Sequence, residues 1–225
     1  DELDPRTQTL LHLAASLYHT TLLTGAGQRD SAYAYLRRER GFTQCTIAGY
    51  GLGYAEGNGL LPVLAASGFA PDDPHLVPLI RPETGRERMA GRIVFCDRDR
   101  AGRVLHLIGR RFAAWLSDEA PKYLSLSEIT KPLYGYACLD KRANGRPVFL
   151  VEGPPDQLTL HQWGYDALAN LGTRLTAHHA ALVAQLRRPV IVVPNNDADP
   201  AKGLSAAESW LESIGHGTLL RLPGA

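Results

Sequence analysis

Apolar residues recur at two different spacings along the chain, and each spacing predicts a different element. In residues 7–23 they return every three or four positions, which predicts an amphipathic helix. The same spacing predicts further helices at residues 31–40, 60–67, 156–163, 176–186 and 204–214. Short apolar runs predict strands at residues 49–54, 92–95, 104–108, 148–151, 167–171, 190–193 and 218–222. The expected fold class is therefore α/β: an α+β part followed by a mostly parallel sheet covered by helices.

Composition places the chain among ordinary globular proteins. Its 225 residues are 44% hydrophobic and 21% charged, enough for one large or two small domains. The formal net charge of +1 gives no overall attraction to nucleic acid. Residues 81–146, however, hold fourteen of the 24 Lys and Arg and eight of the 23 Asp and Glu. This local surplus fits a surface that binds a polyanion, and it fits equally a solvated basic face.

Several classes of protein are not indicated. Three cysteines stand far apart without a Cys-x-x-Cys motif, so neither a zinc site nor a disulfide framework is expected. His178 and His179 lack a metal-ligand partner and are expected to be exposed. No signal peptide or long apolar run appears, which favours a reduced, cytoplasmic protein with no membrane contact. The chain starts at Asp1 without Met, so we expect a fragment of something longer.

Acidic residues follow two of the predicted buried strands. Glu152 and Asp156 come directly after residues 148–151, and Asp197 and Asp199 follow residues 190–193. Parallel neighbouring strands would bring these carboxylates to one edge of the sheet, where they would raise each other's pKa unless a cation neutralised them. Oxygen ligands suit Mg²⁺ or Mn²⁺. Taken singly, each of these four acidic residues could instead be a helix cap or part of a solvated loop.

At these residues the sequence resembles the TOPRIM domain of DnaG-type primases and topoisomerases. That family has a strand ending in Glu-Gly-x-x-Asp, which Glu152 and Asp156 match, and a second strand ending in Asp-x-Asp. Two registers are open for the second motif. It falls either on Asn195-Asn196-Asp197, with Asn in the first acidic place, or on Asp197-Ala198-Asp199. The resemblance implies that Glu152, Asp156 and Asp197 are catalytic and that Asp199 and Asn195 are further metal ligands.

The part before residue 146 is similar to the RNA-polymerase core of DnaG-type bacterial and phage primases. The shared order is Tyr-Leu…Arg-Gly at 35–41, Leu-Gly-Tyr-Ala at 52–55, Ile-Gly-Arg at 108–110, Pro-Lys-Tyr-Leu at 121–124 and Leu-Tyr-Gly at 133–135. One residue more than in the family separates Tyr35-Leu36 from Arg40-Gly41. The resemblance implies binding of template or nucleotide phosphates by Arg40, Arg111 (or Arg110 in its place), Lys122 and Lys131.

The resemblance implies a DNA primase core, a nucleotidyltransferase that makes short RNA primers on single-stranded DNA. It implies two or more Mg²⁺ or Mn²⁺ ions, no zinc in this chain, nucleoside triphosphates as substrates and an RNA primer as product. A replicative helicase would be reached through a C-terminal domain beyond this chain.

The expected subdomains are residues 1–145 (basic, α+β) and 146–225 (metal-binding). A TOPRIM nuclease and a catalytically weak single-strand-binding module are the alternatives. The template trigger sequence, the choice between NTP and dNTP, and the oligomeric state are left open.

Overall fold

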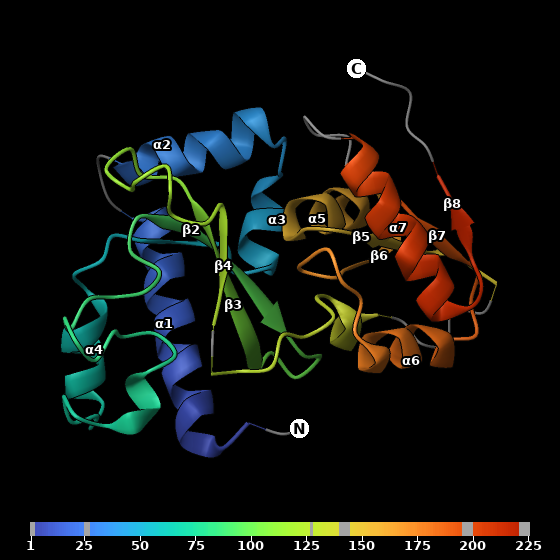
Figure 1. Ribbon diagram of the computed structural model, residues 1–225. Helices are drawn as coiled ribbons and strands as arrows, with labels where there is room; N and C mark the ends of the chain where they lie inside the picture. Colours follow the sequence, from blue (N-terminus) through green and yellow to red (C-terminus); the bar gives the residue numbers. More distant parts are fainter. Residues whose placement is uncertain (1–2, 25–27, 127, 140–144, 195–199, 221–225) are drawn as a thin grey trace. The chain divides into compact units, whose positions relative to one another are not determined.

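The chain forms two compact units, Asp1–Lys131 and Pro132–Ala225, which we describe separately (Figure 1). The structure, a computed structural model, describes residues 3–24, 28–126, 128–139, 145–194 and 200–220. The functional boundary expected at residues 145–146 stays a prediction. Within the described residues no helix is both long and apolar enough to cross a bilayer.

The first unit is an antiparallel sheet of order β1-β2-β3-β4 with helices around it. Its strands are β1 (Gly53–Ala55), β2 (Arg92–Arg98), β3 (Val104–Arg111) and β4 (Tyr123–Ser125). Its helices are α1 (Pro5–Leu23), α2 (Gln28–Ala34), the π-helix η1 (Tyr35–Glu39), α3 (Gln44–Gly49), α4 (Leu60–Ala66) and the 3₁₀-helix η2 (Pro74–Leu76). Strands β2 and β3 pair antiparallel and extend the strands predicted at residues 92–95 and 104–108.

Helix α1 covers one face of this sheet, and a glycine permits the contact. The Asp4 side chain begins the helix by accepting hydrogen bonds from the backbone N–H groups of Arg6 and Thr7. Buried leucines and alanines of α1 share one hydrophobic core with Val94, Cys96 and Leu107 of the sheet. At Gly53 an added Cβ would lie 2.7 Å from the carbonyl carbon of Tyr18. No side chain fits there, so helix and strand pack backbone to backbone.

Two predictions in this unit are wrong. The strand expected at residues 49–54 is shorter and later, because α3 runs through Gly49. The Thr43 side chain accepts from Thr46 N and so starts that helix. The single helix expected at 31–40 is α2 followed by the π-helix η1, in which Arg40 N donates to Tyr35 O five residues back (3.0 Å). Periodicity alone cannot separate one extra residue in a helical turn from a regular helix.

The second unit is a parallel sheet of order β6-β5-β7-β8, as predicted. Its strands are β5 (Val148–Val151), β6 (Asp166–Ala169), β7 (Val190–Val192) and β8 (Thr218–Leu219). Its helices are the 3₁₀-helix η3 (Tyr136–Cys138), α5 (Pro154–Gln162), α6 (Ala177–Gln185) and α7 (Pro200–Ile214). In Figure 1 the sheet lies among α5, α6 and α7. The central strand β5 pairs with both β6 and β7, so its carboxyl end lies in the middle of one sheet edge.

One further prediction is wrong in the second unit. His179 is buried with 4% of its surface exposed, whereas His178 is exposed as expected. Thr176 caps α6 by accepting from His179 N, and this first turn of the helix carries the His179 ring into the core. The strand expected to reach residue 222 ends at Leu219, and residues 221–225 lie outside the described part of the chain.

Candidate nucleic-acid and metal site

Two of the predicted phosphate-binding arginines lie on one tyrosine ring in the first unit. The guanidinium carbon of Arg110 is 4.7 Å from the centroid of the Tyr35 ring, and that of Arg40 is 5.4 Å away. Arg40 Nε also donates to the Tyr35 hydroxyl. Phe112 packs on the same ring at 5.6 Å between centroids. A cation over an aromatic face is stabilised by the ring quadrupole, so Tyr35 holds two positive charges close together.

The π-helical turn explains how Arg40 reaches this position. The extra residue between Tyr35-Leu36 and Arg40-Gly41 would rotate Arg40 away from Tyr35 in a regular α-helix. Widening the turn to five residues absorbs it and restores the alignment. Gly41 then ends the helix with a φ of +67°, and Phe42 N donates to Leu36 O. The π-helical turn therefore holds Arg40 against Tyr35 although the sequence has one extra residue between them.

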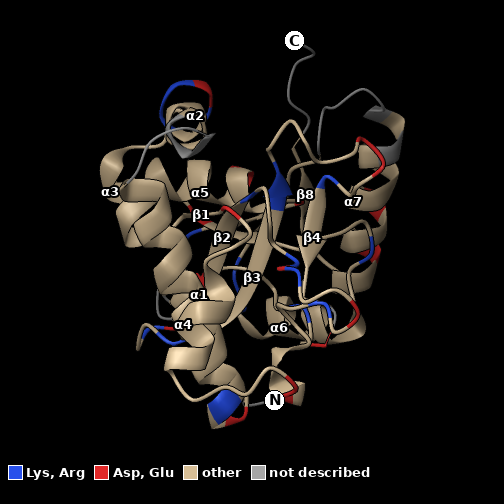
Figure 2. Cartoon of the chain, turned by 90° about the vertical axis from the view of Figure 1, so that its left-hand side faces the viewer, with Lys and Arg blue, Asp and Glu red and all other residues tan. Residues whose placement is uncertain are grey.

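Of the alternatives Arg110 and Arg111, the structure brings only Arg110 to Arg40. Successive residues of β3 point to opposite faces of the sheet. Arg111 donates to Ser117 O (2.9 Å) and Ala120 O (3.3 Å) and pairs with Asp118 (3.3 Å). It therefore shapes the loop after β3. Figure 2 shows the positive charge at the end of β3.

A buried arginine that sequence reasoning missed supports the same loop. Arg92 is 3% exposed and donates to Gly109 O (3.3 Å) and Pro121 O (2.9 Å). Burial lowers the pKa of its guanidinium, and the positive charges of Arg111 and Arg81 lower it further. In the sequence, the only indication of its role was that an arginine is the first residue of an apolar strand. Its contacts hold Pro121 next to the predicted Lys122.

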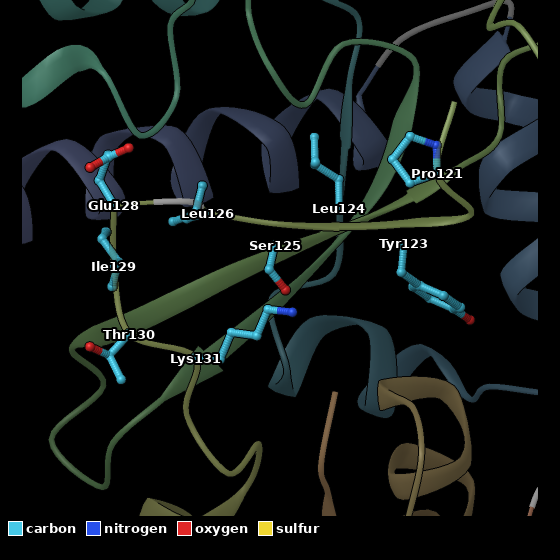
Figure 3. Close-up of a pocket in the computed structure, with 9 residues that line it drawn as sticks. All are labelled: Pro121, Tyr123, Leu124, Ser125, Leu126, Glu128, Ile129, Thr130 and Lys131. Carbon is cyan, nitrogen blue, oxygen red and sulfur yellow. The ribbon is translucent and has the colours of Figure 1, made fainter. Parts of the chain in front are cut away.

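The predicted Lys131 lines a cavity of about 620 Å³ in the first unit (Figure 3). The cavity is lined by Pro121, Tyr123, Leu124, Ser125, Leu126, Glu128, Ile129, Thr130 and Lys131. In Figure 3 the Lys131 ammonium and the Ser125 hydroxyl point toward each other, and the Tyr123 ring lies on the same side of β4. Lys122 is exposed immediately before β4. The lining holds one cation (Lys131), one carboxylate (Glu128) and three hydroxyls, and a cavity of this size can hold a small polar ligand.

Strand β3 also carries a buried histidine that the sequence did not single out. His106 is fully buried, and neither ring nitrogen has a hydrogen-bond partner among the described residues. Burial, and after it the charge of Lys131, lowers the pKa of His106 from 6.5 to about 4. His106 is therefore neutral at physiological pH, and the positive charge beside it belongs to Lys131.

The first acidic motif lies at the carboxyl end of β5 in the second unit. Glu152 follows the strand, Gly153 precedes the first turn of α5, and Asp156 lies within that turn. An added Cβ on Gly153 would be 3.6 Å from Asp156 Oδ2, so this carboxylate lies close to the end of the strand. Pro154 and Pro155 open the helix without amide hydrogens, and a carboxylate there is stabilised by the helix dipole.

The second acidic motif lies outside the described residues. Asn195, Asp197 and Asp199 all fall in residues 195–199, so their placement as ligands stays a prediction. The strand that precedes the motif in the sequence, β7, pairs with β5, and Val193 N donates to Leu150 O (3.0 Å). Within the described ranges, no three His, Cys, Asp or Glu side chains group as metal ligands. The two described carboxylates fit Mg²⁺ or Mn²⁺, since both offer hard oxygen donors at one turn.

The fold and these clusters define a two-unit α/β protein with a basic antiparallel sheet and an acidic edge on a parallel sheet. A family model described as the DNA primase catalytic core, N-terminal domain, matches residues 17–134. The DNA primase of Deinococcus radiodurans is 37% identical over 199 residues, which cover 81% of this chain and 33% of that protein. The chain belongs to the DnaG-type DNA primase family, and the expected resemblance to these primases is confirmed.

Solved structures agree with this assignment. A DNA primase domain from Pseudomonas aeruginosa has a TM-score of 0.79 at 28% identity, covering 97% of this chain and 72% of that one. A DnaG primase catalytic domain bound to single-stranded DNA has a TM-score of 0.75 at 27% identity, covering 97% and 71%. The α/β fold class is therefore confirmed. The chain spans about a third of the length of the curated relative from Deinococcus radiodurans.

Proposed function

We propose that this chain is a primase catalytic core that makes short RNA primers on single-stranded DNA by metal-dependent nucleotidyl transfer. One observation carries the proposal: Glu152 and Asp156 stand at the end of a parallel strand in a chain of the DnaG-type family. Residues 1–145 would be the basic subdomain, and residues 146–225 the TOPRIM subdomain. The relatives are named DNA primases, which supports the activity.

Glu152 and Asp156 would hold the divalent ions, together with Asp197, Asp199 and Asn195. Bound Mg²⁺ or Mn²⁺, two or more, would activate the primer 3′-hydroxyl and stabilise the leaving pyrophosphate. The residues themselves supply negative charge on a fixed turn. Asp156 lies in the first turn of α5, where the helix dipole stabilises a carboxylate.

The basic residues would bind the other reactants. Arg40 and Arg110 on Tyr35 offer paired guanidinium groups for the phosphates of template or nucleotide. The cavity with Lys131 has the size for a nucleotide, and Tyr123 could stack on a base. Lys122 would add a point charge beside it. The related catalytic domain bound to single-stranded DNA supports the template as partner. A replicative helicase as partner and the cytoplasm as location are further parts of the proposal.

The test is incorporation of labelled ribonucleotides on single-stranded DNA, with Mg²⁺ and then Mn²⁺. Three proteins are compared: the wild type, Asp156→Asn, and Glu212→Gln as a control at an exposed acid on α7. We expect template-dependent oligomers from the wild type and the control, and a loss of about 100-fold or more in Asp156→Asn. The same product from all three would refute the role of this edge.

Two other results would favour other functions. Degradation of labelled DNA without nucleotides would indicate a nuclease on the same scaffold. No product from any variant, on bare or pre-primed templates, together with salt-sensitive DNA binding, would indicate a binding module. In the second case the basic residues would still bind phosphates, and the acidic edge of the parallel sheet would not support catalysis.

A further inference from the structure

We infer that the loop after β6, residues 170–174, holds the backbone at Glu152 in position. Asn170 and His179 are the positioning residues of this loop. The inference rests on the proposed function, since it concerns the acidic edge that would bind the divalent ion. Nothing in the sequence pattern of a metal site marks Asn170 or His179. Both are buried polar residues that the proposed chemistry does not use, at 3% and 4% exposure.

The backbone of this loop pins the residue that carries the candidate ligand. Asn170 N donates to Val151 O (3.0 Å), and Leu171 N donates to Glu152 O (3.0 Å). In a regular parallel ladder, successive residues direct their N–H groups to opposite sides, so two in a row cannot bond the same neighbour. The ladder is therefore irregular here, and Leu171 has a φ of +59°, in the left-handed region that residues other than glycine rarely adopt. Such a conformation persists only where its surroundings enforce it.

Asn170 holds the residues that follow Leu171 in place. Its Nδ2 donates to Gly172 O and to Arg174 O, both at 2.9 Å. Because both partners are carbonyls, the amide orientation is fixed, and Oδ1 faces His179 Nδ1 at 3.2 Å. A neutral His179 must then carry its proton on Nδ1 and donate it. One buried side chain thus closes the loop on itself and ties it to α6.

The remaining carbonyl of the loop is held from α7. Trp210 is fully buried, and its Nε1 donates to Thr173 O (2.9 Å). The three consecutive carbonyls from Gly172 to Arg174 therefore all accept hydrogen bonds from buried side chains. The donors Asn170 and Trp210 are buried, and leaving their N–H groups unpaired would be unfavourable, so these bonds stabilise this conformation of the loop. Through Leu171 that conformation fixes the backbone at Glu152, where a metal ligand needs to be held before the ion arrives.

A purely structural loop would make the same hydrogen bonds, so the test must separate metal affinity from stability. Four full-length proteins are compared: the wild type, Asn170→Ala, Asn170→Asp and Val183→Ala. Asn170→Asp keeps the shape and the acceptor for His179 but removes the Nδ2 donor. Val183→Ala removes packing from α6 (Val183 is 1% exposed) and leaves the side chains that hydrogen-bond to the loop unchanged. The dissociation constant for Mn²⁺ is measured by titration calorimetry, and the melting temperature by circular dichroism.

We expect both Asn170 variants to bind Mn²⁺ about tenfold more weakly, the scale for residues that orient metal ligands. Val183→Ala should lose thermal stability and keep its Mn²⁺ affinity. Equal Mn²⁺ affinity in Asn170→Ala and the wild type would overturn the inference, as would an equal loss in Val183→Ala. If the wild type binds no Mn²⁺, or binds it unchanged after Asp156→Asn, the proposed function fails instead. The two failures are therefore distinguishable.

Discussion

Replacing Tyr35 with Phe tests whether one hydroxyl orients Arg40 for phosphate binding. The change removes only the oxygen that accepts from Arg40 Nε. The ring remains, with Arg110 at 4.7 Å and Phe112 at 5.6 Å, so the core contact is conserved. Any effect can therefore be assigned to the hydrogen bond on Arg40 rather than to packing.

The magnitude follows from the kind of bond and its exposure. A hydrogen bond to a charged group contributes about 1.5–3 kcal/mol, and the lower end applies because Arg40 is half-buried. The attraction between Arg40 and the ring, about 0.5–1 kcal/mol at such a site, remains. If the lost bond had held Arg40 in its binding position, affinity for single-stranded DNA should fall by roughly tenfold, the equivalent of about 1.4 kcal/mol.

The assay is fluorescence anisotropy with labelled single-stranded DNA at several salt concentrations. Tyr35→Phe, Arg40→Ala and the double variant form a cycle, and Tyr33→Phe is the control on the preceding helix. We expect the two changes to be coupled, with Tyr35→Phe having little further effect once Arg40 is absent. If Tyr35→Phe weakens binding by the same factor with and without Arg40, the hydroxyl does not act through this arginine and the reasoning is wrong.

Three other predictions follow from the first unit. Deleting Arg38 should turn the π-helical turn into an α-helix and leave Arg40 in place, with DNA affinity within about threefold of the wild type; a loss as large as that of Arg40→Ala would contradict this. Gly53→Ala should destabilise the protein by about 1–3 kcal/mol in urea unfolding, because the new Cβ would lie 2.7 Å from the Tyr18 backbone; an unchanged midpoint would show that α1 can move. His106 takes up a proton near pH 6.5 when unfolded and near pH 4 when folded, so the free energy of unfolding should fall between these values as pH drops, by up to about 3 kcal/mol. His106→Gln should remove that part of the slope, and an identical slope in both proteins would refute the assignment.

Short-range patterns were enough to predict the parallel sheet and the first acidic motif. A buried strand is a run of apolar residues, and Glu152 and Asp156 follow such a run directly, so their position at the strand end is a property of neighbouring residues. The cap at Thr176 is local in the same way. Asp197 and Asp199 stay predictions, because they lie outside the described residues.

Other features depend on residues far apart in the sequence. The choice between Arg110 and Arg111 could not be made from two adjacent arginines, because it depends on which face of β3 meets Tyr35. His179 looked like a surface residue in its helix, but it is buried and its ring faces Asn170, which lies in another segment.

The sequence by itself therefore determined the class of fold, the family and the end of the strand where carboxylates stand. These depend on spacing within a few residues, which the backbone geometry of helices and strands dictates. Only the tertiary structure decided that the π-helical turn brings Arg40 to Tyr35 and that Arg110 lies on the same ring. It also decided that the buried amide of Asn170 closes the loop that contacts Glu152. Those contacts join segments that are far apart in the sequence. Packing sets their distance in space, and a local pattern of residues does not specify that distance.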